Sequence, residues 1–295
     1  MKSILITGCS SGFGKRAAKH LADRGYHVYA TMRNVEGKNA EAAANLCTHA
    51  APGNGRIEVI ELDVTSDQSV AGAIARIGKV DVLINNAGKG YGGPVESFSS
   101  SECLDQLDLN IVGPMRVANA VLPGMRERGS GLIIQVSSTA GRAAFPGFGI
   151  YHASKWGLEG LSEALRYELA PLGIDVVIVE PGPFSTNFFG NLSTPSDPEI
   201  ARAYRHVADF GEGFTQQVTQ LFEDKDAPTD PQVVVDIFQR LIETPAGSRP
   251  LRTIAGLDFG YQAYNDAVEP IRKQSLENMG IAEWDGPSPP ANAAS

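Results

Sequence analysis

A tyrosine and a lysine four positions apart are the residues of this sequence best suited to acid–base chemistry. Tyr151 and Lys155 occur in the segment Tyr-His-Ala-Ser-Lys, which opens a helical pattern that runs to Leu169. Residues i and i+4 share a helix face, so the ammonium lies beside the phenol. A phenol with a pKa of about 10 is a poor acid or base at neutral pH, and a nearby ammonium lowers that pKa. The spacing therefore predicts Tyr151 as a proton donor and acceptor.

A serine at the end of a predicted strand extends this group. Ser138 precedes Tyr151 by 13 residues and follows the apolar run at 131–136. In a parallel sheet covered by helices, ligands bind beyond the carboxyl ends of the strands. A hydroxyl group there can hold a substrate oxygen as charge develops on it. The three side chains together indicate proton transfer at a carbonyl or alcohol oxygen.

A glycine-rich turn follows the first apolar run and is typical of a dinucleotide-binding loop. From Thr7 the chain reads Thr-Gly-Cys-Ser-Ser-Gly-Phe-Gly and leads directly into a helical pattern. Glycines let the backbone approach a pyrophosphate, and a helix N-terminus presents free N–H groups. The alternative is an ordinary tight turn between a strand and a helix. The predicted cofactor contacts in this loop are Gly8, Ser10, Ser11, Gly12, Phe13 and Gly14.

The end of the second apolar run decides which dinucleotide is expected. Enzymes that use NAD place an acidic residue there, about 20 residues past the glycines, to bind the ribose 2′-hydroxyl. This chain has Ala-Thr-Met-Arg-Asn at 30–34 and so offers no carboxylate. Arg33 can pair with a 2′-phosphate, and Ser11 can add a hydrogen bond. The sequence predicts NADP(H), and the alternative is that Arg33 is a solvated loop cation.

These residues must be positioned by alternating strands and helices. The apolar cores of the predicted strands are nearly continuous, which is typical of parallel strands buried on both faces. We therefore expect an α/β fold with a Rossmann-like, doubly wound, parallel seven-stranded sheet and helices on both faces, in one domain over residues 1–285. The expected strands are 3–7, 27–32, 57–62, 80–85, 131–136, 174–179 and, more weakly, 252–255; the expected helices are 13–22, 67–77, 102–128, 151–169 and 231–242.

Taken together, the motifs resemble the short-chain dehydrogenase/reductase family in its simple single-domain form, from residue 3 to about residue 186. The resemblance implies a tetrad in which Asn110, holding a water for proton relay, joins Ser138, Tyr151 and Lys155. It also implies that Tyr151 exchanges the proton and that Lys155 binds the nicotinamide ribose. Further cofactor contacts implied by the resemblance are Asp63 and Val64 at the adenine, Asn86, Ala87 and Gly88 beside the sheet, and Pro181, Gly182, Phe184 and Thr186 near the nicotinamide.

Two features refine the resemblance. Phe13 stands where the family usually has isoleucine or leucine, and we expect this to alter only the packing near the cofactor. The segments 31–33 and 93–97 look similar to the steroid- and retinol-dehydrogenase-like branch.

The substrate side is predicted in a lid region at about 184–228 and in the loop at 143–148. Both are rich in apolar and aromatic residues, including Phe145, Phe148, Phe188 and Phe189. An apolar pocket with few polar anchors suits a hydrophobic ketone, aldehyde or alcohol. The alternative is that these aromatic side chains only pack the lid against the body of the protein.

Two other functions are compatible with the same loop and tyrosine. A sugar-nucleotide epimerase or dehydratase can share both motifs but needs a larger C-terminal substrate domain than the roughly 110 residues that follow residue 182. A non-catalytic NADP(H)-sensing protein is expected to lose the tyrosine or the lysine, and both are present here. The expected activity is thus an NADP(H)-dependent oxidoreductase acting on a small-molecule carbonyl or alcohol substrate.

Composition limits the partners. The net charge of -9 argues against nucleic acid, and no apolar run is long enough to span a membrane. Three cysteines without paired spacing, together with the lack of a signal peptide, indicate a reducing, cytoplasmic location. The histidines lack metal-ligand spacing, and we expect no metal, a packing role for His152 and Cys9, and a disordered segment at 286–295. The resemblance implies a homodimer or homotetramer paired through 102–128 and 151–169.

Overall fold

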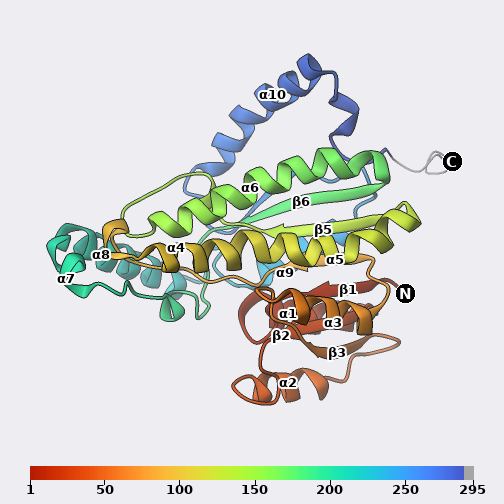
Figure 1. Cartoon of the computed structure of the whole chain (residues 1–295), viewed down its shortest axis with the longest axis horizontal. Coiled ribbons are helices and arrows are strands. Elements are labelled where there is room, and N and C mark those ends of the chain that lie inside the picture. Colours follow the sequence, from red (N-terminus) through yellow and green to blue (C-terminus); the bar gives the residue numbers. More distant parts are fainter. Residues whose placement is uncertain (289–295) are drawn as a thin grey trace.

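The computed structural model describes residues 1–288, and its centre is one parallel sheet (Figure 1). The strand order is β3-β2-β1-β4-β5-β6-β7. The order reverses between β1 and β4, and ligands bind at the carboxyl edge of a sheet at such a reversal. The predicted doubly wound fold is confirmed. The strands are β1 (Ser3–Ile6), β2 (His27–Met32), β3 (Arg56–Glu61), β4 (Val82–Asn85), β5 (Gly131–Val136), β6 (Ile174–Pro181) and β7 (Arg252–Ala255).

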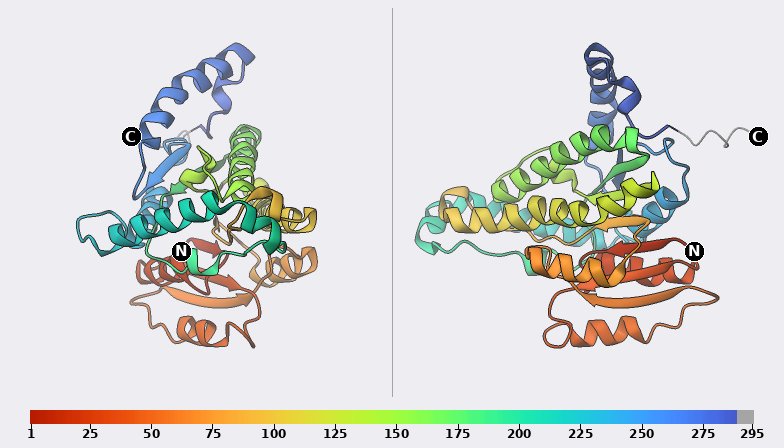
Figure 2. Two further views of the ribbon diagram at one scale, coloured as in Figure 1. Left: turned by 90° about the vertical axis from the view of Figure 1, so that its left-hand side faces the viewer. Right: turned by 45° about the vertical axis from the view of Figure 1, so that its right-hand side comes forward.

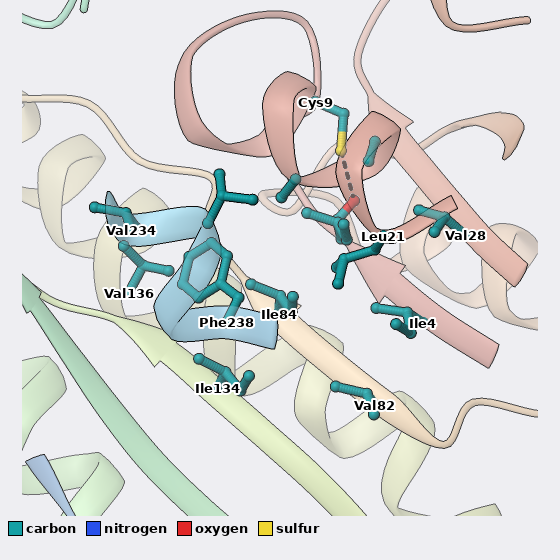
Figure 3. Close-up of a cluster of buried hydrophobic side chains, with 14 of the residues drawn as sticks. Ile4, Cys9, Leu21, Val28, Val82, Ile84, Ile134, Val136, Val234 and Phe238 are labelled. Atoms are coloured by element: carbon teal, nitrogen blue, oxygen red, sulfur yellow. Dashed lines mark hydrogen bonds between the residues drawn. The ribbon is translucent and has the colours of Figure 1, made fainter. Parts of the chain in front are cut away.

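Two apolar cores cover the two faces of the sheet. On one face, α1 (Gly12–Asp23), α2 (Ala40–Cys47) and α9 (Gln232–Glu243) pack against alternate strand residues. Figure 3 shows part of this core, where Phe238 of α9 meets Ile84 and Ile134 of the central strands. On the other face, α3 (Asp67–Ile77), α5 (Gly113–Arg128) and α6 (Gly149–Leu169) enclose the second core. Burial on both faces explains the nearly continuous apolar strands.

The helix predicted at 102–128 is interrupted. The structure has α4 (Ser100–Leu107), then a π-helical turn at Asp108–Val112, then α5. Pro114 has no N–H to donate to the carbonyl four residues earlier, which belongs to Asn110, and its ring crowds that carbonyl. The wider turn relieves this conflict, and such bulges occur frequently at functional sites. Here the turn carries Asn110.

Four helices were not predicted from the sequence, and the first of them is α2, between β2 and β3. The lid region contains α7 (Pro198–Ala203) and α8 (Arg205–Glu223), and the chain continues after β7 into α10 (Tyr261–Met279). Figure 2 shows α10 projecting from the body of the molecule, while α7 and α8 lie at one end of it. In the predicted disordered segment, Gly286 and Pro287 are buried, and residues 289–295 lie outside the described residues.

Candidate active site

The predicted catalytic side chains come together at the carboxyl edge of the sheet. Tyr151 and Lys155 lie in the first turns of α6, Ser138 follows β5, and Asn110 lies in the π-helical turn. The ammonium of Lys155 is 5.9 Å from the centre of the Tyr151 ring. A Cβ atom added to Gly88 would lie 3.3 Å from Asn110 Oδ1 and 3.8 Å from Lys155 Nζ. The loop after β4 therefore lies in contact with Lys155 and so close to Asn110 that a side chain at 88 would press on the Asn110 amide.

Tyr151 is a buried phenol. Burial raises its pKa to about 12, and a hydrogen bond with the Ser138 side chain opposes that rise. This corrects the expectation that Lys155 lowers the pKa of Tyr151. The Lys155 ammonium instead donates to the Val136 carbonyl at 2.9 Å, beside rather than on the phenol oxygen. Tyr151 is thus protonated at neutral pH, which suits a group that donates a proton to an oxygen gaining negative charge.

The ammonium of Lys155 has a pKa well below that of an ordinary lysine. Burial lowers the pKa of its ammonium to about 8, and the nearby carboxylate of Glu159 raises it in part. A buried ammonium with few partners costs free energy, so its charge depends on the groups around it. The sequence analysis did not single out Glu159. It stands one turn beyond Lys155 on α6, and the same i, i+4 spacing that identified Tyr151 and Lys155 could have found it.

The Asn110 side chain connects the loop after β4 to α6 through hydrogen bonds. Its amide nitrogen donates to the Lys89 carbonyl and to Ser154 Oγ, each at 3.0 Å, and its amide oxygen accepts from the Lys89 N–H at 3.2 Å. These bonds explain why the side chain is fully buried. The role of Asn110 in holding a relay water stays a prediction.

Ser138 faces Tyr151 from the neighbouring strand end. Its hydroxyl donates to the Pro181 carbonyl at 3.2 Å and accepts from the Ala140 N–H at 3.1 Å. The bond to Pro181 connects the end of β5 to the end of β6, and the bond from Ala140 caps the turn after β5. The serine oxygen is held within reach of the phenol, and a substrate oxygen placed between them would meet two hydroxyl groups.

The glycine-rich loop has the close approaches that a pyrophosphate site requires. Gly8 has a positive φ of +74°, and a Cβ on Gly14 would lie only 2.5 Å from the Gly8 carbonyl oxygen and 2.6 Å from Asn86 Nδ2. The Asn86 amide donates to the Thr7 carbonyl at 2.8 Å and to the Gly8 carbonyl at 3.2 Å. Asn86 thereby joins the loop after β4 to the loop after β1. A Cβ on Gly12 meets no heavy atom within 4 Å, so this part of the loop faces open space.

The N-terminus of α1 is suited to bind an anion. Ser11 is the N-cap residue, its side chain makes no capping hydrogen bond, and the first turn contains no acidic residue. The partial positive charge of the helix end is therefore not neutralised by the protein itself. The shape of the loop is compatible with a dinucleotide, and contacts of Gly8, Ser10, Ser11, Gly12, Phe13 and Gly14 with its phosphates stay predictions.

Arg33 is exposed at the end of β2, next to the loop that carries Ser11. Its guanidinium makes one long ion pair, 3.8 Å from Asp63 Oδ2, and its side chain is 64% exposed. Asp63 is held by its own turn, because its Oδ1 accepts from the Thr65 N–H at 3.0 Å. Val64 is buried against Gly113, where a Cβ would lie 2.9 Å from Val64 Cγ2. Arg33 therefore keeps free donors for a phosphate group.

The segment after β6 turns back over the cofactor loop. A Cβ on Gly182 would lie 1.9 Å from the Leu257 carbonyl oxygen, so only glycine fits there. Phe184 is buried, and its ring packs edge-on against Phe13 with ring centres 5.3 Å apart. Phe13 thus acts through packing near the cofactor loop. The Thr186 N–H donates to the Phe184 carbonyl at 2.7 Å, which tightens the turn into the lid.

An aromatic cluster surrounds Tyr151 on the substrate side. The Tyr151 and Phe188 rings have centres 5.4 Å apart, and Phe145 lies 5.4 Å from Phe214 of α8. Leu192, which the sequence analysis did not name, packs against the same cluster. The lid helix therefore contributes side chains to the surroundings of the catalytic phenol. The other aromatic members are Phe148, Phe189 and Phe210.

Two residues near the site have structural roles, as predicted. His152 Nδ1 lies 2.8 Å from the Ala140 carbonyl oxygen, and the Phe145 N–H donates to His152 Nε2 at 3.2 Å. Burial lowers the pKa of this histidine, so the neutral ring fixes the loop before α6. Cys9 is buried in the core, burial raises its pKa to about 12, and its thiol donates to the Ile6 carbonyl at 3.3 Å (Figure 3).

No group of three or more histidine, cysteine or acidic side chains within residues 1–288 is arranged to hold a metal ion. Among the helices of that same part of the chain, none combines the length and apolar character that crossing a membrane requires.

Comparisons with known proteins agree with this geometry. Residues 2–197 match the short chain dehydrogenase family. Human 17-beta-hydroxysteroid dehydrogenase type 1 is 36% identical over 82% of this chain and 74% of the relative, and human retinol dehydrogenase 8 is 40% identical over 70% and 69%. A short-chain dehydrogenase structure from Streptomyces avermitilis is 35% identical, covers 95% of this chain and 97% of its own, and has a TM-score of 0.73. Two other similar structures, each 25% identical, were solved with NADP bound.

Proposed function

Because this chain belongs to the short-chain dehydrogenase/reductase family of oxidoreductases, in its steroid- and retinol-dehydrogenase-like branch, we propose that it is an NADP(H)-dependent reductase of hydrophobic ketones or aldehydes. One observation carries the proposal. Tyr151 is a protonated phenol that is hydrogen-bonded to Ser138, backed by Lys155 and surrounded by phenylalanine rings. An acid in an apolar pocket suits a carbonyl group on an apolar molecule.

Each catalytic side chain has its own role in the proposed reduction. Bound NADPH supplies a hydride to the carbonyl carbon. The Ser138 hydroxyl, which donates to the Pro181 carbonyl in this structure, turns to donate its one proton to the substrate carbonyl oxygen. Tyr151 transfers its proton to that oxygen as the alcohol forms. The Lys155 ammonium stabilises the phenolate that remains and binds the nicotinamide ribose. Asn110 fixes the loop beside Lys155 and connects the lysine, through water, to solvent.

The choice of NADP(H) is supported by Arg33 and Ser11. Strand pairing places the end of β2 directly beside the end of β1, so the two residues border one region of the surface. Arg33 is exposed and has free donors, and no carboxylate follows β2 at 33–34 to bind a ribose 2′-hydroxyl. The NADP-bound structures among the similar proteins add to this argument.

Two other functions receive less support. The residues beyond 182 form two lid helices, α9, β7 and α10, and within the described chain they build no separate sugar-binding domain of the kind an epimerase or dehydratase needs. A cofactor-sensing protein does not need the tyrosine–serine pair that is assembled here. The chain also retains free cysteines at 9, 47 and 103, which supports a cytoplasmic location.

Pairing with copies of the same chain is part of the proposal. Leu104 on α4 is 65% exposed and Trp156 on α6 is 47% exposed, and both lie on the helices through which pairing is expected. Large exposed apolar side chains on neighbouring helices support a homodimer or homotetramer.

The test is oxidation of NADPH with a panel of ketones and aldehydes of increasing apolar surface. We expect the highest kcat/KM with the most apolar substrates. Tyr151→Phe removes the proton donor while keeping the ring, so kcat falls roughly 100- to 10,000-fold, the range typical for loss of a general acid. Binding of NADPH, followed by fluorescence, stays within a factor of about two, since the hydroxyl is a minor part of the interface. Near-normal turnover by this variant refutes the assignment.

A further inference from the structure

Two buried glutamates lie behind Lys155, away from the substrate. Glu159 is one turn beyond Lys155 on α6, and Glu180 precedes Pro181 in β6, the strand over which α6 packs (Figure 1). Glu159 is 3% exposed and Glu180 is 0% exposed. Arg252 of β7 joins them, because its Nε is 2.9 Å from Glu159 Oε2 and 3.6 Å from Glu180 Oε1. The proposed reaction assigns no role to either carboxyl group.

In each carboxyl group, only one of the two oxygens accepts a hydrogen bond. Glu159 Oε2 accepts from Arg252, and Glu180 Oε2 accepts from the Asn265 amide of α10 at 2.6 Å. Glu159 Oε1 and Glu180 Oε1 are buried and have no hydrogen-bond partner. Glu180 Oε1 lies 3.6 Å from Arg252 Nε and 3.7 Å from Arg142 Nε, beyond hydrogen-bond distance. Two carboxylates this close repel each other, and a buried charged oxygen without a hydrogen bond is costly. One proton retained by the pair reduces both costs.

The surrounding charges indicate which glutamate keeps the proton. Burial and the charge of Glu159 raise the pKa of Glu180 to about 8, against the opposing effects of Asn265, Arg142 and Arg252. Glu159 is closer to cations, because Arg252 bonds to it directly and Lys155 precedes it on the same helix face. The charged groups that face Glu159 are Lys155 and Glu163 from α6, Arg252 from β7, Glu180 from β6 and Arg142 from the loop before α6.

We propose that Glu159 is a positioning residue that holds Lys155 in its charged form, and that Glu180 keeps Glu159 ionised by taking the one proton that the carboxyl pair retains. The inference rests on the proposed function, in which the Lys155 ammonium stabilises the Tyr151 phenolate. The two effects on Lys155 support it: burial lowers the pKa of the ammonium to about 8, and the Glu159 charge raises it. Glu159 is therefore the group that opposes loss of the charge.

Glu159 borders a cavity on the side of α6. It lines a cavity of about 420 Å³ together with Arg252, Trp156, Glu163 and Tyr167, whereas Glu180 is fully buried behind it. None of the residues of the aromatic cluster around Tyr151 lines this cavity.

The first experiment follows the titration of Lys155 directly. Carbon-13 NMR of the lysine ε-carbons in cofactor-free protein, assigned by comparison with Lys155→Met, gives a midpoint near pH 8 for the natural chain. Glu159→Gln removes the charge that raises the pKa, so we expect the midpoint to move to lower pH. Glu180→Gln replaces a neutral acid by a neutral amide, so we expect it to move the Lys155 midpoint much less. Glu163→Gln is the matched control, since Glu163 binds the same Arg252 but is more exposed, and it leaves the midpoint in place.

The second experiment measures the pH profile of kcat/KM for the carbonyl reduction. In Glu159→Gln the decline on the alkaline side begins at lower pH, so activity falls several-fold at pH 8 and recovers at pH 6. Glu159→Asp keeps the charge and restores part of the profile, and circular dichroism checks that each variant is folded. An unchanged Lys155 midpoint in Glu159→Gln, or an equal shift in Glu180→Gln, overturns the inference. Because the NMR midpoint needs no turnover, an inactive protein that shows the shift contradicts the proposed function and leaves this inference intact.

Discussion

The surroundings of Tyr151 suit it to the role of proton donor that we propose for it. In the described structure the phenol is buried, and burial keeps it protonated until it meets an oxygen that is gaining charge. The sequence suggested that Lys155 lowers the pKa of the phenol, but the ammonium bonds instead to the Val136 carbonyl. In the proposed mechanism, the ammonium stabilises the phenolate after the proton has left. The same side chains are thus proposed for the reaction, but the proposed role of Lys155 differs from the one predicted from the sequence.

Arg33 gives a prediction at the same scale. Arg33→Ala removes the cation that would face the 2′-phosphate, and an exposed charge-assisted hydrogen bond contributes about 1–2 kcal/mol, or roughly 5- to 30-fold in kcat/KM. We expect this loss with NADPH and little change with NADH, measured by steady-state kinetics with one good substrate. Arg16→Ala is the control, because Arg16 is a similarly exposed cation that pairs with Asp230 at 3.4 Å. An equal loss with both cofactors contradicts the assignment.

At the scale of elements, the π-helical turn and the glycine-rich loop position the site. The turn presents Asn110 inward between Lys89 and Ser154, which a regular helix through Pro114 would not do without a clash. The loop brings the backbone of β1 against that of β4 through Asn86. Both the turn and the loop depend on residues with a low helix propensity: a proline near the start of α5 and several glycines close together in the loop.

Gly14→Ala tests the loop. The added Cβ would lie 2.5 Å from the Gly8 carbonyl oxygen and 2.6 Å from Asn86 Nδ2, so both must move. We expect a loss of about 1–3 kcal/mol in the free energy of unfolding, typical of overpacking, and weaker NADPH binding. The measurements are urea denaturation and a cofactor titration. Gly72→Ala in α3 is the control, because its Cβ meets no heavy atom within 4 Å and alanine favours a helix interior. A Gly14 variant as stable as the natural chain shows that the loop tolerates a side chain.

At the scale of the whole molecule, a buried ionic network joins distant segments. Arg166 of α6 is 3% exposed and donates to Asp175 of β6 at 2.9 Å and to Asp285, after α10, at 2.8 Å. Arg249 also binds Asp175, at 3.0 Å. The network connects α6, β6 and the segment after α10, which are separated by up to 119 residues in the sequence.

Arg166→Met tests this network. The substitution leaves Asp175 buried with one remaining arginine, and breaking a buried pair in this way costs about 3–5 kcal/mol at most. We expect a lower midpoint of urea unfolding and a larger effect than for Arg202→Met, whose ion pair with Glu199 lies on the surface. Equal stability of the two variants shows that the network contributes no more than a surface pair.

Much of the fold was predictable because its signals are local. A strand buried on both faces is apolar throughout, and a helix packed on a sheet is apolar on one side, so the seven strands and the helices α1, α3, α6 and α9 could be recognised along the chain. The helices α8 and α10 were not, since Gly211 and Gly213 lie inside α8 and Pro270 lies inside α10. Each of these residues lowers helix propensity. The apolar pattern of α10 is also weak, whereas α8 has Val207, Phe210, Phe214 and Val218 at helical spacing, a signal that could have identified it.

From the sequence alone, the family and the parallel sheet could be predicted, and both are confirmed. The phosphate loop and the roles of Ser138, Tyr151 and Lys155 were predicted from short spacings at strand ends and helix turns, whereas Asn110 was predicted from the resemblance to the family. The tertiary structure alone decided how the charges are held. It buried Tyr151, turned Lys155 toward Val136, placed Phe214 of α8 in the aromatic cluster, and brought Glu180 to Glu159 across β6 and α6. Burial and the pKa values that follow from it depend on residues far apart in the chain, and packing alone brings these together.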